Sequence, residues 1–153
     1  MQNSGFGRFF EDFKVGEQVQ HPLSKTIFES DNNLFSMMTM NAHPVHTNLA
    51  YAEGQQHGQI LVVGTLVFSL AVGITVPEIS GKAIANLEYS WVKHLHPVFL
   101  NDTINVVTEV LSKRESKSKL DRGIVEVKST AMNQNGTPVL SFQRKVLVKR
   151  NVI

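Results

Sequence analysis

The stretch "GTLVFSLAVGITVP", residues 64–77, is apolar almost all round, with small residues interspersed. A helix that is apolar on every side must be enclosed by other structure, because one polar face is needed to meet water. We therefore predict a buried central helix here. Pro77 is expected to end it, since proline cannot continue the hydrogen bonds of a helix interior. The rest of the chain must supply a surface that covers this helix.

The second half of the chain supplies such a surface. Four extended runs are rich in Val, Ile, Thr and aromatic residues, which favour strands. They cover residues 83–95, 102–116, 123–134 and 138–150. Turn-forming residues separate them, and Asn135-Gly136 is typical of a hairpin turn. With an earlier strand expected around residues 18–27, the pattern predicts an antiparallel sheet.

Two shorter helices are expected before the central one. "SDNNLFSMMTM", residues 30–40, has apolar side chains at helical spacing behind a cap at Ser30 or Asp31. "HTNLAYAEGQ", residues 46–55, predicts a short helix that ends near Gly54. The order of elements predicts an α+β fold, an antiparallel sheet wrapped around a long central helix. We expect one domain over residues 1–153, because no linker interrupts the chain.

Composition excludes several classes of protein. The absence of cysteine excludes disulfide scaffolds, cysteine-zinc sites and thiol catalysis. The formal charge of +2, from 15 Lys+Arg against 13 Asp+Glu, is too small to indicate nucleic-acid binding. The start, "MQNSGFGRFFEDF", lacks the apolar segment of a signal peptide, and the apolar run over residues 60–76 is too interrupted to span a bilayer. We expect a cytoplasmic globular protein that binds neither nucleic acid nor membrane.

The segment "MNAHPVHTN", residues 40–48, brings Asn41, His43 and His46 close together in the sequence. It could form a metal site, a proton-transfer site, or a polar turn in which the histidines simply make hydrogen bonds. A metal site is disfavoured because Asn41 is a poor zinc ligand and no usual third ligand is near. Pro44 also prevents a regular helical display of the two histidines. The residues alone leave the other two interpretations open.

A wider pattern bears on this choice. "MNAHPVHTNLAYA", followed by "VVGTLVFSLAVG" and "HPVFLNDTI", resembles the MaoC-like hydratase/dehydratase family of hotdog folds. The resemblance extends from "FFEDFKVGE" to "VLVKR", nearly the whole chain. It implies a hotdog fold and an enoyl-CoA hydratase or 3-hydroxyacyl-CoA dehydratase, a carbon–oxygen lyase.

The resemblance also implies roles for individual residues. His46 falls on the family's catalytic histidine, and Gly64 on the glycine whose N–H polarises the thioester carbonyl. Asn41 falls on the catalytic aspartate, so an amide replaces a carboxylate. An amide cannot take a proton but can orient a water, whereas an imidazole can accept a proton near neutral pH. We therefore expect His46 to act as the base, Asn41 to hold the water and Gly64 to bind the thioester oxygen.

Other positions are expected to contact the substrate. His43 replaces an asparagine of the family, Val63 replaces a frequent histidine, and Thr65 follows Gly64, where it could equally be a helix cap. The basic segment "SKRESKSK" is expected either to meet the phosphates of coenzyme A or to form a solvated hairpin tip. Its cations include Lys113, Arg114 and Lys117. We do not assign His94 and His96, which flank Leu95, to the site.

The amide at Asn41 also bears on the substrate. Together with the opening "GRFFEDFKVGE", it resembles a subgroup that acts on short, branched C4–C5 dicarboxylic acyl-CoAs of the mesaconyl, itaconyl or methylmalyl type. Such a substrate carries its own carboxylate, and a second carboxylate beside it would cost electrostatic energy. Asn41 would remove that repulsion. The resemblance implies no cofactor and no metal, because coenzyme A is part of the substrate.

Two alternatives remain. A hotdog acyl-CoA thioesterase is disfavoured because no acidic residue occurs between Glu53 and Glu78, around the start of the central helix. In a non-catalytic acyl-CoA-binding paralogue the missing aspartate would mark lost chemistry, but His46 and Gly64 are both retained. A sheet wrapped around one helix leaves an edge strand, and hotdog domains join two sheets into one. We therefore expect a homodimer or a dimer of dimers.

Overall fold

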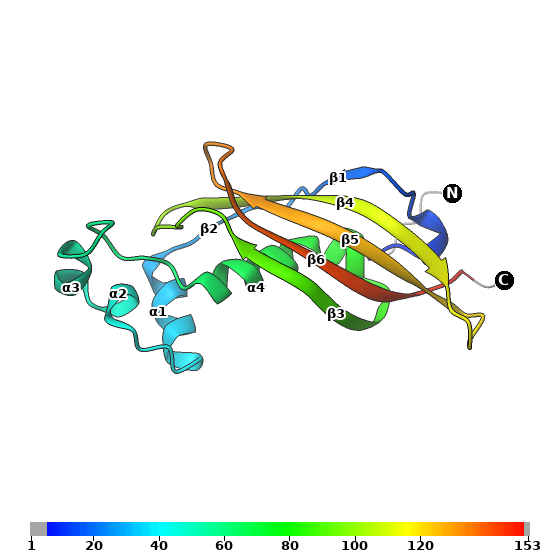
Figure 1. The fold of residues 1–153 in the computed structure, drawn as a ribbon, viewed down its shortest axis with the longest axis horizontal. Coiled ribbons are helices and arrows are strands. Elements are labelled where there is room, and N and C mark those ends of the chain that lie inside the picture. The colour runs from blue at the N-terminus through cyan, green and yellow to red at the C-terminus, as the bar shows by residue number, and fades with distance from the viewer. Residues whose placement is uncertain (1–5, 152–153) are drawn as a thin grey trace.

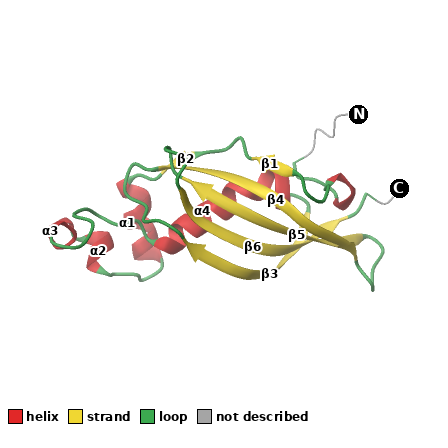
Figure 2. Cartoon of the chain, turned by 45° about the horizontal axis from the view of Figure 1, so that its top comes forward, coloured by secondary structure: helices red, strands yellow, loops and turns green. Residues whose placement is uncertain are grey.

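In the computed structural model, which describes residues 6–151, one helix lies against the concave face of a curved antiparallel sheet. This helix, α4 (Gly64–Thr75), is the central helix expected from the sequence (Figure 1; Figure 2). Residues 1–5 and 152–153, which the expected domain includes, lie outside the described residues. The predicted architecture, a sheet wrapped around a long helix, is confirmed.

The sheet has the order β1-β4-β5-β6-β3, and β2 pairs with β4 as well. Its strands are β1 (Gln18–Gln20), β2 (Lys25–Thr26), β3 (Ala83–His94), β4 (Thr103–Glu115), β5 (Arg122–Met132) and β6 (Pro138–Lys149). The four long strands occupy the predicted runs. The single early strand expected over residues 18–27 is instead divided in two, because Pro22 between the halves has no N–H to give to a sheet ladder.

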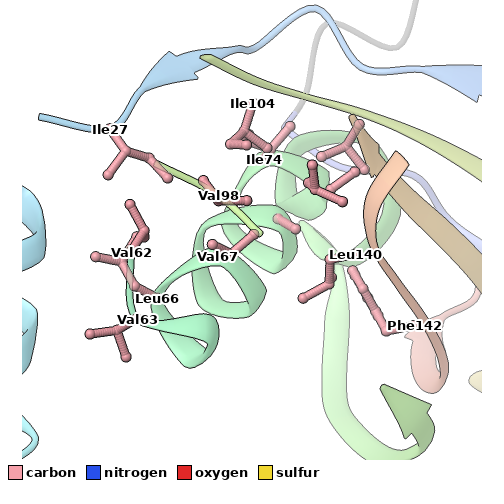
Figure 3. Close-up of a cluster of buried hydrophobic side chains, with 14 residues drawn as sticks. Ile27, Val62, Val63, Leu66, Val67, Ile74, Val98, Ile104, Leu140 and Phe142 are labelled. Carbon is pink, nitrogen blue, oxygen red and sulfur yellow. The ribbon is translucent and has the colours of Figure 1, made fainter. Parts of the chain in front are cut away.

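The core forms where alternate side chains of the sheet meet α4. Figure 3 shows Val62, Leu66 and Val67 at the start of the helix, facing Ile104 of β4 and Leu140 of β6. Each such side chain contributes roughly 1.5–3 kcal/mol when it is fully buried. The burial of these residues explains why the helix sequence is apolar almost all round.

Arg144 of β6 is a buried cation on the same strand face as the buried Phe142 and Val146. Its side chain is only 2% exposed and faces the end of α4. Its Nη2 donates to Thr75 Oγ1 at 2.8 Å and its Nη1 to Asn86 Oδ1 at 3.3 Å. Burial lowers the pKa of this guanidinium. Arg144 therefore links β6 to both the central helix and β3.

Two predicted helix boundaries are wrong. Helix α1 (Glu29–Met38) begins before both predicted caps, and Phe28 precedes it. Asp31 lies within the first turn of the helix and stabilises its start, because its carboxylate accepts a hydrogen bond from the Phe28 N–H at 2.9 Å. Pro77 does not end the central helix, which continues as a wider π-helical turn, η2 (Val76–Ser80). Proline is tolerated near the start of that turn, where its missing N–H breaks few hydrogen bonds.

Three short elements complete the fold. Helix α2 (Pro44–Thr47) begins at Pro44, so the proline that prevents a long helix here starts a short one. Helix α3 (Leu49–Glu53) ends at Gly54, as predicted. A 3-10 turn, η1 (Phe10–Asp12), lies near the termini. Figure 1 shows α1, α2 and α3 gathered at one end of the sheet, beside the start of α4. Within residues 6–151, no helix is both long and apolar enough to cross a membrane.

Candidate active site

A cavity of about 350 Å³ lies at the start of α4, and both His46 and Gly64 line it. Most of the remaining lining is apolar and comes from the segment before α4 and from the ends of β3 and β6. These apolar residues are Leu61, Val62, Val67, Leu95, Pro97, Val98 and Val139. His94 and His96 complete the lining. One chain therefore brings together the two groups that the sequence motif singles out.

The ring of His46 is held in a defined orientation. Its Nδ1 lies 2.7 Å from the carbonyl oxygen of Leu61. Because a carbonyl oxygen can only accept a hydrogen bond, Nδ1 carries the hydrogen. In the neutral ring, Nε2 therefore has a free lone pair. This is the form of histidine that can take a proton from a water or a substrate.

Asn32 of α1 connects His46 to the start of α4. It is only 1% exposed. Its Nδ2 donates to the backbone oxygen of His46 at 3.2 Å, and its Oδ1 accepts from the N–H of Val63 at 2.9 Å. Val63 directly precedes the first residue of α4. Asn32 thus fixes the backbone of both candidate catalytic residues, a role that sequence reasoning missed.

Gly64 occupies the first position of α4. Among residues 6–151, no hydrogen-bond acceptor is found for its N–H, which is one of the donors that a helix start leaves unpaired. The positive end of the helix dipole lies at the same place. A Cβ atom at this position would lie 2.8 Å from Cε1 of His94. A side chain at position 64 would therefore have to displace the His94 ring.

His94 and His96, which were not assigned to the site from the sequence, belong to the cavity. His94 is the last residue of β3. His96 follows it, and its Nδ1 donates to the carbonyl oxygen of Pro138 at 2.8 Å. The two histidines flanking Leu95 were the available signal, but only the fold shows that this strand end lies over the start of α4. Within residues 6–151, no His, Asp and Glu side chains form a group of three that could hold a metal ion.

The other residues expected near the substrate do not line this cavity. Oδ1 of Asn41 accepts a hydrogen bond from the His43 N–H at 3.4 Å. Nδ1 of His43 in turn accepts from the Val45 N–H at 3.2 Å, at the start of α2. Val63 is buried in the core, and Thr65 is exposed on the first turn of α4. Their contact with a substrate stays a prediction.

The basic segment lies at the opposite end of the sheet. His94 pairs with Leu140, which lies level with Val106 of β4, whereas Lys113 lies seven residues further along β4. Seven strand residues span roughly 23 Å. Arg114 and Lys117 lie beyond Lys113, whose Nζ donates to the backbone oxygen of Phe10 at 3.2 Å. Within one chain, these three cations are not brought to the cavity.

A second cavity, of about 390 Å³, lies between α1 and α4. Its lining includes Ile27, Phe35, Leu66 and Leu70, and it has no histidine. Lys25 and Asp31, which form an ion pair at 2.6 Å, also line it. Within residues 6–151 this cavity can therefore hold apolar groups, but it offers no histidine as a base and its cation is already paired.

Residues 11–133 match the model of the MaoC like domain. The chain belongs to the MaoC-like family. It is 33% identical over 144 residues to a mesaconyl-CoA hydratase of Cereibacter sphaeroides, an alignment that covers 94% of the chain. It is 32% identical over the same length to a beta-methylmalyl-CoA dehydratase of Chloroflexus aurantiacus, again over 94% of the chain.

The MaoC-like chain has the hotdog fold, as expected. It superposes with a TM-score of 0.82 on a Mycobacterium tuberculosis protein described as a double hotdog fold, at 21% identity. The match covers 95% of this chain and 45% of that one. The alignments with the hydratase and the dehydratase cover only 42% and 41% of those proteins. The MaoC-like chain thus spans about two fifths of the length of the curated relatives it matches.

Proposed function

We propose that this MaoC-like chain catalyses the reversible hydration of a short 2-enoyl-CoA. The observation that carries the proposal is that His46 and the Gly64 N–H open into the same cavity, with the ring of His46 oriented to accept a proton at Nε2. The relatives named as a hydratase and a dehydratase of CoA esters support the same reaction class.

The reaction follows from these two groups. The thioester oxygen accepts a hydrogen bond from the Gly64 N–H at the positive end of α4. A water loses a proton to Nε2 of His46 as its oxygen attacks the β-carbon, and the electron pair of the double bond moves toward the thioester oxygen. The imidazolium then returns a proton to the α-carbon on the same face. An oxyanion donor of this kind contributes about 3–4 kcal/mol to catalysis.

In this mechanism, Asn41 holds the attacking water. Its described hydrogen bond to the His43 N–H is 3.4 Å long, which is beyond the usual range of 2.7–3.2 Å for such bonds. The side chain is also partly exposed. A rotation that brings the amide to the water next to His46 therefore breaks only a weak contact.

The favoured substrate is a branched C4–C5 dicarboxylic enoyl-CoA. Among residues 6–151, neither aspartate nor glutamate lines the cavity, so the free carboxylate of such a substrate would meet no like charge from them. Asn41 keeps the neighbouring position uncharged as well. The name of the mesaconyl-CoA hydratase relative agrees with this class of substrate.

The active unit is proposed to be a homodimer joined at β3. This strand lies at one edge of the sheet, and most of its residues are exposed. If two β3 strands pair in antiparallel fashion, the far end of one sheet comes to the cavity end of the other. That arrangement would bring Lys113, Arg114 and Lys117 of a second copy toward the phosphates of a coenzyme A bound at His46.

The proposal predicts that His46→Ala lowers kcat by roughly 10²- to 10⁴-fold, because a general base contributes that much. The substitution should leave the circular dichroism spectrum unchanged, since His46 is only partly buried. The assay follows the loss of enoyl-thioester absorbance and measures free thiol in parallel. His57→Ala is the matched control, because His57 is an exposed histidine outside this cavity.

The same assay distinguishes the alternatives. A hydratase loses the absorbance without releasing thiol, a thioesterase releases thiol, and an acyl-CoA-binding protein does neither. Near-normal turnover by His46→Ala would remove His46 from the mechanism.

A further inference from the structure

The cavity contains two histidines that the proposed mechanism does not use. Among residues 6–151, the charged or titratable side chains in its lining are those of His94, His96 and His46, without lysine or arginine. A charged group that enters this largely apolar cavity can therefore find a side-chain partner only among these three rings, and an unpaired charge is costly in such surroundings.

We propose that His94 binds the free carboxylate of the substrate, the one not joined to coenzyme A. His94 would thereby select dicarboxylic over monocarboxylic enoyl-CoAs. The inference rests on the proposed function and names the residue that sets its substrate class. A thioester whose oxygen lies on the Gly64 N–H places its acyl carbons beside that glycine. The His94 ring lies in direct contact with Gly64, because a Cβ there would be only 2.8 Å from its Cε1 and 3.3 Å from each ring nitrogen.

The hydrogen bonds of the other two histidines exclude them from this role. His46 offers a lone pair at Nε2, which is required for the base. Nδ1 of His96 donates to the Pro138 oxygen, so the neutral ring turns a lone pair, not an N–H, to other partners. Among residues 6–151, the ring of His94 makes no hydrogen bond. A neutral His94 ring can therefore present its N–H to a carboxylate.

The backbone of His94 is held at the end of β3. His94 pairs with Leu140 of β6, and the N–H of the following residue, Leu95, donates to the Val139 oxygen at 2.9 Å. The side chain of His94, which is exposed, therefore starts from a fixed point beside the first residue of α4.

The test compares two substrates that differ only in the group proposed to bind His94. Mesaconyl-CoA and tiglyl-CoA share the same branched carbon skeleton, and tiglyl-CoA has a methyl group in place of the carboxylate. The ratio of their kcat/KM values is measured for the wild type, His94→Phe and His94→Gln, with His96→Phe as the matched control. Phenylalanine keeps the volume of the ring, and glutamine keeps an N–H donor.

We expect the wild type to favour mesaconyl-CoA, and His94→Phe to lower kcat/KM for it by roughly tenfold to a hundredfold, the value of a hydrogen bond to a charged group. The value for tiglyl-CoA should change by less than about twofold, since no such bond is lost. His94→Gln should keep part of the preference, and His96→Phe all of it.

An equal fall with both substrates, or an unchanged ratio in His94→Phe, would overturn the role of His94 while leaving the hydratase intact. A wild type that prefers tiglyl-CoA would overturn it as well. A wild type that hydrates neither ester would instead remove the proposed function, and the assignment of His94 with it.

Discussion

At the scale of single residues, Asn32 determines how the two candidate catalytic groups are held relative to each other. Its amide bonds the His46 oxygen on one side and the Val63 N–H on the other. No water can replace these bonds easily, because the side chain is almost completely buried. A buried donor or acceptor that loses its partner costs about 1–3 kcal/mol.

We therefore predict that Asn32→Ala lowers the free energy of unfolding by about 1–3 kcal/mol and also lowers kcat, because both His46 and Gly64 lose a backbone restraint. Urea denaturation and the absorbance assay provide the two measurements. Asn33→Ala is the control, since Asn33 is the exposed neighbour on the same helix. An effect of Asn32→Ala no larger than that of Asn33→Ala would contradict the role of Asn32.

Sequence motifs could predict His46 and Gly64 because each has a fixed spacing to its neighbours in the family pattern. They could not predict Asn32 or His94. Asn32 lies in a stretch whose helix could be predicted, but its partners at His46 and Val63 are brought to it by the packing of other elements. The ring of His94 lies next to Gly64 although the two residues are 30 positions apart in the chain, and the sequence alone does not show that they are close.

At the scale of elements, the continuation of α4 beyond its predicted end places Glu78 against His21, which in turn contacts Thr108 of β4. Oε2 of Glu78 lies 2.6 Å from Nδ1 of His21, whose Nε2 lies 2.8 Å from Oγ1 of Thr108. Nδ1 therefore donates to the carboxylate, and Nε2 accepts the hydroxyl hydrogen of Thr108. Burial lowers the pKa of His21 below its ordinary value of 6.5, and Glu78 opposes this shift only in part.

The lowered pKa of His21 gives stability a defined pH dependence. Below pH 6.5 the unfolded chain binds a proton that the folded chain does not bind, so the free energy of unfolding falls as the pH is lowered. Above pH 6.5 both states are neutral at His21 and this contribution is constant. Urea denaturation at about pH 5.5 and 7.5 measures this effect. The free energy of unfolding should differ less between the two pH values in His21→Gln than in the wild type.

The opposite sign would contradict this account. In that case the wild type would be more stable at pH about 5.5 than at about 7.5, and His21→Gln would abolish this gain. The ring would then be held as an imidazolium paired with Glu78.

At the scale of the whole molecule, β3 is an exposed edge with apolar side chains along it. Leu87 is 47% exposed and Tyr89 38%, and the strand pairs only with β6 in one chain. Long apolar edges are rarely left open, because they invite pairing with another strand.

We predict that the 17.1 kDa chain sediments as a homodimer or a dimer of dimers. Leu87→Lys should shift it toward the monomer, because a charge in the middle of β3 would be buried on pairing. Leu120→Lys is the matched control, since Leu120 is 81% exposed in the hairpin at the far end of the sheet. Analytical ultracentrifugation provides the measurement. A wild type that sediments as a monomer at all concentrations would contradict the expected assembly.

The overall fold could be predicted because the apolar helix and four long strands leave few ways to bury the helix. The position of the basic segment relative to the cavity could not be predicted. Lys113 and the cavity at His46 lie toward opposite ends of one sheet, so the proposed meeting of the two requires a second chain, which one sequence does not describe.

The most direct test of the central claim is a crystal structure of the His46→Ala variant with mesaconyl-CoA bound. We predict that the thioester oxygen lies about 3 Å from the Gly64 nitrogen, with the β-carbon turned toward the space left by the His46 ring. A thioester found in the apolar cavity between α1 and α4, away from Gly64, would contradict the claim.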